Sequence, residues 1–336
     1  MNAATAEFLV APDGSWYFLE LNARLQVEHP ATELAFGIDL VAWQLRIARG
    51  EHLTLAQSDI RPIAHAIEAR VYAEDPVAML PTGGRLLDVH LPSSGEIRID
   101  HALSAGSEIS LAYDPMLAKV LVAAPTREAA RTGLIAALET MALPGVVTNI
   151  PLLLHALRIP SFVDMLHHTG TLEATPVPAE ALELPEDVAR TARSLQMAAP
   201  ADDPFASLAG WRASSDQGAL PQVPADEVRI AHAGDVMWVT WRGQSWELPR
   251  SPIAAHHHAD EALHADRATL TAPMPGTVIT TVPAGTHVTA GEAVVVLEAM
   301  KMENSIAAPF DGIVEQVSCS VGDLVTRGAV LAEVSR

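Results

Sequence analysis

The sequence predicts a multidomain α+β protein: a mixed α/β region, then a small β-rich domain, then an all-β flattened sandwich. Strand-like and helix-like stretches alternate as far as about residue 173. Two low-complexity stretches, 174–203 and 251–268, divide the chain of 336 residues. An internal repeat occupies residues 269–336. A chain of this length is long enough for two or three domains.

Composition and charge exclude several classes of protein. Net charge is −20 and hydrophobic residues make up 49% of the chain, so we expect packed cores and neither nucleic acid nor an anionic membrane as partner. No apolar run approaches the roughly 20 residues of a membrane span, and the N-terminus lacks the pattern of a signal peptide. The single cysteine, Cys319, fits a reducing compartment. We therefore expect a cytoplasmic protein.

Two strands and a helix are expected in the first fifty residues. Residues 7–10 and 16–27 have strand-like patterns on either side of the turn sequence at 12–15. Pro30 disfavours helical backbone at His29, which predicts that the second strand stays extended. A helix is expected over 32–49, because apolar residues recur there every three or four positions and Gly50 follows.

The next region, 51–173, continues the mixed pattern. Strand-like runs lie around 64–72, 95–99 and 117–122. Thr126 is a suitable N-cap for a helix whose apolar face includes Leu134, Leu138 and Met141. These elements predict an α/β domain.

The middle of the chain predicts a small β-rich domain over 204–250. Residues 228–230 and 236–241 are expected to form a hairpin with its turn at 233–235. Three consecutive histidines, 256–258, lie in the second low-complexity stretch. They could bind a metal, but a solvated linker is the favoured interpretation, since no ligand pair there has helical or turn spacing. The domain also contains four tryptophans: Trp211, Trp238, Trp241 and Trp246.

The repeat near the C-terminus predicts a symmetric sandwich. The pattern A-P-x-x-G-x-V at 272–278 recurs at 308–314, and V-T-x-G at 288–291 recurs at 325–328. Such a duplication implies two similar halves related by a pseudo-twofold axis. Lys301 lies between the halves, directly after an apolar strand, so we expect it at or near an exposed hairpin tip.

Polar residues alternate with apolar ones through segment 19–30. Glu20, Asn22, Arg24, Gln26 and Glu28 share one face if the backbone stays extended. Mg²⁺ prefers oxygen ligands, and arginine supplies a planar fork for an oxyanion such as bicarbonate or phosphate. The pattern therefore indicates a metal and oxyanion site, with a surface ladder of ion pairs as the alternative.

The string Glu298-Ala299-Met300-Lys301-Met302 resembles the attachment sequence of biotinyl carrier domains. The resemblance implies that a biotin protein ligase joins biotin to Lys301 through an amide, and that the resulting arm visits two active sites. Lipoyl domains share this fold but usually lack methionines on both sides of the lysine, so a lipoyl lysine is the weaker alternative. An ordinary surface lysine is a third interpretation, which the position between two repeats disfavours.

Segment 19–30 resembles the end of the ATP-grasp domain of biotin carboxylases, whose motif is E-x-N-x-R-x-Q-V-E-H. The resemblance assigns 1–50 to the ATP-grasp end and 51–173 to the biotin carboxylase C-terminal domain. It also implies ATP as a substrate and Mg²⁺ or Mn²⁺ as its metal. The implied site residues are Glu7, Glu20 and Asn22 for the metal, Arg24, Gln26, Val27 and Glu28 for bicarbonate, and Arg24, Glu28 and Arg70 for catalysis.

In this resemblance Glu28 is the general base that deprotonates bicarbonate, and Arg70 stabilises negative charge that develops on biotin. Glu68 could instead be an ion-pair partner of Arg24 or Arg70, and His29 is expected only to form hydrogen bonds. The stretch 113–119 also matches and is given a structural role. The family's glycine-rich loop over the ATP phosphates is not in the sequence, so we expect the chain alone to be an inactive fragment.

The length of chain between the carboxylase-like region and the carrier-like region indicates which partner the protein needs. About 95 residues separate them, far fewer than the roughly 250 of a barrel-type carboxyltransferase domain. We therefore expect a hetero-oligomer with a carboxyltransferase beta subunit that binds the acyl-CoA, docked by the tryptophan-rich region 204–250. The compact size favours a 3-methylcrotonyl-CoA carboxylase alpha subunit. Propionyl-, acetyl- or geranyl-CoA carboxylase, or a non-catalytic biotin carrier protein, are the alternatives.

Overall fold

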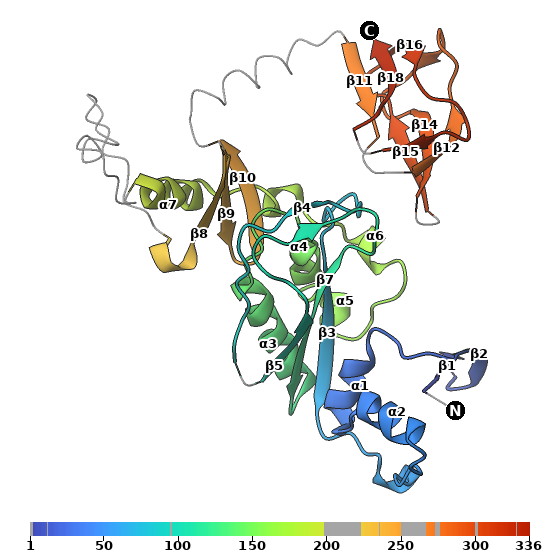
Figure 1. Ribbon diagram of the computed structural model, residues 1–336, viewed down its shortest axis with the longest axis vertical. Helices are drawn as coiled ribbons and strands as arrows, with labels where there is room; N and C mark the ends of the chain where they lie inside the picture. The colour runs from blue at the N-terminus through green and yellow to red at the C-terminus, as the bar shows by residue number, and fades with distance from the viewer. Residues whose placement is uncertain are drawn as a thin grey trace.

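The computed structural model describes residues 3–11, 13–94, 96–197, 223–234, 236–249, 267–272, 276–299, 302–326 and 328–336 (Figure 1). Three features singled out in the sequence lie outside the described residues. They are Lys301, the histidines 256–258 and Trp211.

The first two strands form a hairpin, and the loop after it differs from the prediction. β1 (Thr5–Val10) and β2 (Trp16–Asn22) pair antiparallel. A strand reaching residue 27 is wrong, because β2 ends at Asn22 and α1 (His29–Phe36) begins at His29. Pro30 lies in the first turn of α1, where proline is tolerated since the first amides of a helix have no acceptor within it.

The prediction of one helix over 32–49 is also wrong. α1 ends at Phe36 and is followed by the C-cap Gly37, whose φ of +66° is left-handed, and then by α2 (Leu40–Ala48). The Asp39 side chain caps α2 by accepting a 2.7 Å hydrogen bond from the Ala42 amide. Apolar spacing continues across the break, so periodicity alone does not reveal it. Gly37 and Asp39 are the local signals that do.

A three-stranded antiparallel sheet forms the centre of the α/β region. Its order is β3 (His65–Tyr72), β7 (Met116–Ala124), β5 (Ile97–His101), which confirms the three predicted strands. One face is apolar and joins α3 (Arg127–Thr140) in a buried core, so Thr126 and the apolar face of this helix are confirmed. The other face is polar, and α1 covers part of it.

Short elements complete this region: η1 (Gln57–Asp59), β4 (Gly84–Arg85), β6 (Glu108–Ile109), α4 (Ile150–Ala156), α5 (Pro160–Val163), α6 (Thr171–Ala174) and η2 (Ala179–Ala181). Strands β4 and β6 pair with each other. In the described part of the chain, no helix combines the length and the apolar character needed to cross a bilayer.

The middle sheet consists of β8 (Arg229–Ala233), β9 (Val236–Trp241) and β10 (Gln244–Pro249), in the order β10-β9-β8 and preceded by η4 (Ala225–Glu227). The predicted hairpin is confirmed, and β10 extends it. The stretch 174–203 is not only a linker, because α7 (Glu186–Met197) buries Val188 and Ala192 against this sheet. The sheet also touches the α/β region: a Cβ on Gly243 would come within 2.4 Å of the Leu138 carbonyl.

The C-terminal strands form the expected sandwich of two antiparallel sheets (Figure 1). One sheet has the order β11-β18-β16-β13 and the other β15-β14-β12-β17. The repeat is visible in this topology, because β12 pairs with β14 and β17 as β16 pairs with β18 and β13. The strands are β11 (Arg267–Thr271), β12 (Gly276–Thr281), β13 (His287–Val288), β14 (Ala293–Ala299), β15 (Met302–Ala307), β16 (Gly312–Val317), β17 (Leu324–Val325) and β18 (Val330–Ser335).

Candidate active site

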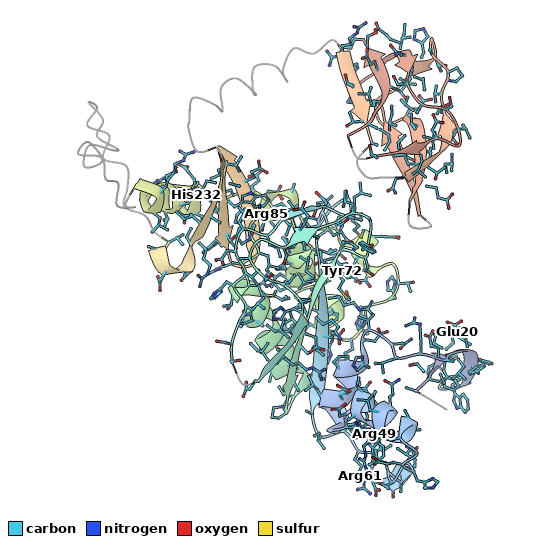
Figure 2. All side chains as sticks on the ribbon, in the orientation of Figure 1. Glu20, Arg49, Arg61, Tyr72, Arg85 and His232 are labelled. Atoms are coloured by element: carbon cyan, nitrogen blue, oxygen red, sulfur yellow. The ribbon has the colours of Figure 1, made fainter. Side chains whose placement is uncertain are left out.

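The β1–β2 hairpin brings together the residues expected to bind a metal. Glu7 and Glu20 are directly opposite each other on the paired strands, and Figure 2 labels Glu20 there. The Asn22 amide nitrogen lies 2.7 Å from Glu7 Oε1 and 3.1 Å from Glu20 Oε1. Gln26 Nε2 donates to the same Glu7 oxygen over 3.1 Å. The sequence prediction that Glu7, Glu20 and Asn22 lie near one another therefore agrees with this geometry.

The two carboxylates of this cluster are the groups that could hold a divalent cation. Mg²⁺ in proteins is commonly held by one or two carboxylates together with waters and substrate phosphates. Glu7 and Glu20 supply two carboxylates, and Asn22 supplies an amide within contact of both. Among the described residues no group of three or more His, Cys, Asp or Glu side chains is arranged to hold a metal on its own. Two carboxylates are too few to fill the coordination shell of Mg²⁺, so an ion held here would need waters or substrate oxygens as further ligands.

The loop between Asn22 and α1 is compact rather than extended. The Arg24 amide donates to the Asn22 carbonyl over 2.9 Å, and the Arg24 guanidinium lies 3.4 Å from the Leu25 carbonyl. Arg24 is exposed and contacts no carboxylate within the described residues. His29 Nδ1 is 2.8 Å from the Gln26 carbonyl, which accords with the hydrogen-bonding role expected for this histidine. The predicted row of side chains on one extended face is therefore absent after Asn22.

The end of this loop meets the polar face of the central sheet. The Arg70 guanidinium on β3 forms an ion pair with the Glu28 carboxylate. Lys119 on β7 donates to the Val27 carbonyl over 3.3 Å and forms a 3.2 Å ion pair with Asp100 on β5. Arg70, Lys119 and Asp100 are cross-strand neighbours, so their side chains emerge on the same face. The sheet thus holds both Val27 and Glu28 in place.

A second set of ion pairs joins α1 to the same polar face of the sheet. Arg98 on β5 contacts Asp100 over 2.9 Å and Glu33 of α1 over 2.7 Å. Glu33 is only 7% exposed, and its other oxygen accepts a 2.8 Å hydrogen bond from the Leu40 amide at the start of α2. The hydrogen bond from Arg98, aided by that from Lys119, lowers the pKa of Asp100 despite partial burial. The carboxyl group of Asp100 is therefore ionised near neutral pH.

The network of ion pairs on the polar face of the sheet was not predicted from the sequence. Lys119 received only a structural role, and Arg98, Asp100 and Glu33 received none. One signal was available, because Lys119 is the lone charged residue in the otherwise apolar strand Met116–Ala124. A lysine in a buried strand needs an acceptor, and here it has two.

Glu68 behaves differently from its neighbours. Both of its carboxylate oxygens are buried and lack a hydrogen-bond partner within the described structure. The predicted alternative of an ion pair with Arg24 or Arg70 is therefore wrong, since Arg70 is engaged with Glu28 instead. Burial raises the pKa of Glu68 to about 7, although nearby Lys119 and Arg70 act in the opposite direction.

The remaining candidate residue, Lys301, lies in sequence between two paired strands of the C-terminal sandwich. Ala299, the last residue of β14, pairs with Met302, the first of β15, and Glu298 pairs with Glu303. Met300 and Lys301 connect these two paired ends and are outside the described residues. The strands around them bury Val295 and Leu297 in the sandwich core. A rigid β scaffold therefore flanks the predicted attachment lysine on both sides.

Family comparisons match three parts of the chain. Residues 1–56 match the ATP binding domain of the carbamoyl-phosphate synthase L chain. Residues 68–174 match the biotin carboxylase C-terminal domain. Residues 268–334 match the biotin-requiring enzyme (biotinyl/lipoyl) domain. The three matches follow one another along the chain in the order predicted from the sequence: ATP binding, biotin carboxylase C-terminal domain and biotinyl domain.

The relatives that align with almost all of this chain are alpha subunits of acyl-CoA carboxylases. The chain is 34% identical to a biotin-dependent acyl-coenzyme A carboxylase alpha3 subunit of Mycobacterium leprae, with 99% of this chain and 54% of that protein aligned. It is 31% identical to a propionyl-CoA carboxylase alpha chain of Ruegeria pomeroyi (99% and 60%). It is 30% identical to a mitochondrial methylcrotonoyl-CoA carboxylase subunit alpha of Dictyostelium discoideum (99% and 58%). The chain thus spans little more than half the length of these relatives.

A solved structure supports the carboxylase part. The biotin carboxylase domain of 2-oxoglutarate carboxylase from Hydrogenobacter thermophilus, determined with MgADP, ADP and bicarbonate, aligns with a TM-score of 0.52 and 41% identity. The alignment covers 55% of this chain and 40% of that one. Taken with the domain order, these relatives show that the chain is similar along almost its whole length to alpha subunits of biotin-dependent acyl-CoA carboxylases, and that it contains a biotin carboxylase part and a biotinyl domain.

Proposed function

We propose that the chain carries the bicarbonate-binding part of a biotin carboxylase site and the lysine that bears biotin, as part of an acyl-CoA carboxylase alpha subunit. The observation that supports this most is the Glu28–Arg70 ion pair at the end of a loop that Lys119 holds by the Val27 carbonyl. A carboxylate paired with a fixed guanidinium, in the same loop as the exposed cation Arg24, suits an oxyanion that must lose a proton.

The proposed chemistry assigns one task to each group. The Glu28 carboxylate accepts the proton of bicarbonate, and the paired Arg70 holds the carboxylate in position beforehand. Arg24 and the backbone at Gln26 and Val27 orient the bicarbonate oxygens. Arg70 then faces the negative charge that develops on biotin during carboxylation.

Glu7, Glu20 and Asn22 would hold the metal, Mg²⁺ or Mn²⁺. A bound ion would neutralise charge on the phosphates of ATP. Gln26, which contacts Glu7 and belongs to the bicarbonate loop, connects the proposed metal and oxyanion positions.

Biotin on Lys301 would carry the carboxyl group to a second active site. The partner there is a carboxyltransferase beta subunit that binds the acyl-CoA, docked through 204–250 in a cytoplasmic hetero-oligomer. We propose 3-methylcrotonyl-CoA as the acceptor. Propionyl-CoA is the alternative, since relatives of both types have nearly equal identity, 30% and 31%. Assaying the purified complex with each acyl-CoA decides between them.

Attachment of biotin is tested by expressing the 336-residue chain with a biotin protein ligase. Intact mass is expected to show one biotin addition, and a tryptic map is expected to place it on Lys301. Lys301→Arg, which keeps the charge but cannot be biotinylated, and Lys301→Ala are both expected to abolish capture by streptavidin. Capture of either variant, or a lipoyl mass on Lys301, would contradict the proposal.

A further inference from the structure

Glu68 is a buried carboxyl group for which the proposed chemistry gives no role. Neither carboxylate oxygen reaches solvent or a hydrogen-bond donor among the described residues. A buried polar group without a partner costs folding free energy, and nearly all such groups in folded proteins are paired. Its presence in the middle of a polar sheet face therefore needs an explanation beyond stability.

Charged groups surround Glu68, and each of the others has its own partner. Arg70 lies two residues along β3 on the same face and is paired with Glu28 from the loop before α1. Lys119 on β7 is bound to the Val27 carbonyl and to Asp100. Arg98 on β5 is bound to Asp100 and to Glu33 of α1. Of these cations, only Arg70 is paired with a group that the proposed reaction protonates.

We propose that Glu68 is a positioning residue that receives the Arg70 guanidinium when Glu28 takes up the bicarbonate proton. The inference rests on the proposed function of Glu28 as a base. Protonation of Glu28 removes the charge that holds Arg70, and Glu68 is the next carboxylate on the same face of the same strand. Moving the guanidinium toward Glu68 turns it away from the spent base while keeping it within the site.

No bond between heavy atoms changes in this step. The proton from bicarbonate stays on Glu28, and Arg70 exchanges one carboxylate for another. Burial raises the pKa of Glu68 to about 7, so a fraction of molecules carries a proton there at neutral pH. In that fraction the proton leaves to water as Arg70 arrives, since an adjacent guanidinium favours the ionised carboxyl group.

The experiment is a titration of Glu68 by carbon-detected NMR of side-chain carboxyl groups, with the resonance assigned by its loss in Glu68→Gln. Four forms of the chain are compared: wild type, Arg70→Met, Glu28→Gln and the double variant. Glu28→Gln imitates the protonated base. We expect Arg70→Met to raise the pKa of Glu68 by about one unit more in the Glu28→Gln background than in the wild type. This coupling arises only if Arg70 moves toward Glu68 when residue 28 loses its charge.

Equal effects of Arg70→Met in both backgrounds would overturn the proposal, because through-space charge alone predicts equality. Amide exchange of α3 in each variant verifies that the domain is folded. If a variant does not fold, a crystal structure of Glu28→Gln supplies the second test: Arg70 is expected to bond to Glu68, and a guanidinium that stays at residue 28 would refute the idea. The titration needs neither ATP nor bicarbonate, so its failure is distinguishable from a failure of the proposed function.

Discussion

At the scale of single residues, Lys119 connects the sheet to the loop that carries the proposed base. Its amine is largely buried, and it satisfies two acceptors at once, the Val27 carbonyl and the Asp100 carboxylate. Val27 immediately precedes Glu28, so the hydrogen bond fixes the backbone next to the base. The position of Glu28 therefore depends on a contact between two residues, Val27 and Lys119, that are 92 positions apart in sequence.

Replacing Lys119 should loosen this loop without unfolding the domain. Lys119→Met is expected to speed amide exchange of residues 23–28 by about tenfold or more, since a hydrogen bond to a charged group contributes about 1.5 to 3 kcal/mol. Lys119→Arg keeps a cation that reaches the same acceptors and should retain most of the protection. Unchanged exchange of 23–28 in Lys119→Met would show that the loop is held by other contacts.

Glu68 should make the free energy of unfolding fall as the pH rises from about 4.5 to about 7. Its pKa in the folded chain is raised to about 7 from an ordinary value of 4.5, so the folded state keeps a proton that the unfolded state loses between these values. The contribution to stability is complete below about pH 4.5, falls as the pH rises toward 7, and is constant above it.

The neutral Glu68→Gln variant should lack this decline. Relative to wild type, its free energy of unfolding should increase by about 1 to 3 kcal/mol between pH 4.5 and 7, allowing for partial burial. Denaturant unfolding of both proteins across this range measures the difference. A constant difference at all pH values would show that Glu68 titrates normally.

At the scale of elements, the break between α1 and α2 sets the path of the backbone between the loop at 23–28 and strand β3. Gly37 has a left-handed φ of +66°, and a Cβ there would lie 2.9 Å from Ile63 Cδ1. The break also places Asp39 to cap α2 and lets Glu33 reach the Leu40 amide. A continuous helix would lose both contacts.

Gly37→Ala should destabilise this corner by about 1 to 2 kcal/mol, because an alanine pays a steric penalty in the left-handed region. Gly37→Asn should cost less, since asparagine adopts this conformation more readily. Amide exchange of α1 and α2 reports the effect locally. Equal protection in wild type and Gly37→Ala would mean that the turn tolerates a side chain.

Elements set by local sequence were predictable, and elements set by distant contacts were not. Thr126 caps α3 through the Ala129 amide three residues later, so its role could be read from the sequence. The repeat likewise predicted the symmetric sandwich, because both halves carry the same turn residues. The end of β2 at Asn22 was missed, since alternating polarity continues to Glu28 while the backbone turns toward Arg70 and Lys119.

At the scale of the whole molecule, one chain carries the proposed oxyanion site and a C-terminal sandwich that matches a biotinyl domain. The sandwich has its own buried core, separate from the core of the α/β region. Covalent connection would make each encounter between Lys301 and the site intramolecular, which raises the effective concentration of the carried group. The motif residues indicated the candidate groups, but only the fold showed that Glu7 lies directly opposite Glu20 and that Glu28 and Arg70 meet over the sheet.

The most direct test of the proposed oxyanion site is hydrogen exchange of residues 23–28 with and without bicarbonate, using chloride at equal ionic strength as the control. We expect bicarbonate to slow exchange of these amides in a saturable way, and Arg24→Met to abolish the effect while leaving exchange of α3 unchanged. Identical exchange in bicarbonate and chloride across the full concentration range would contradict the assignment of this loop as the bicarbonate site.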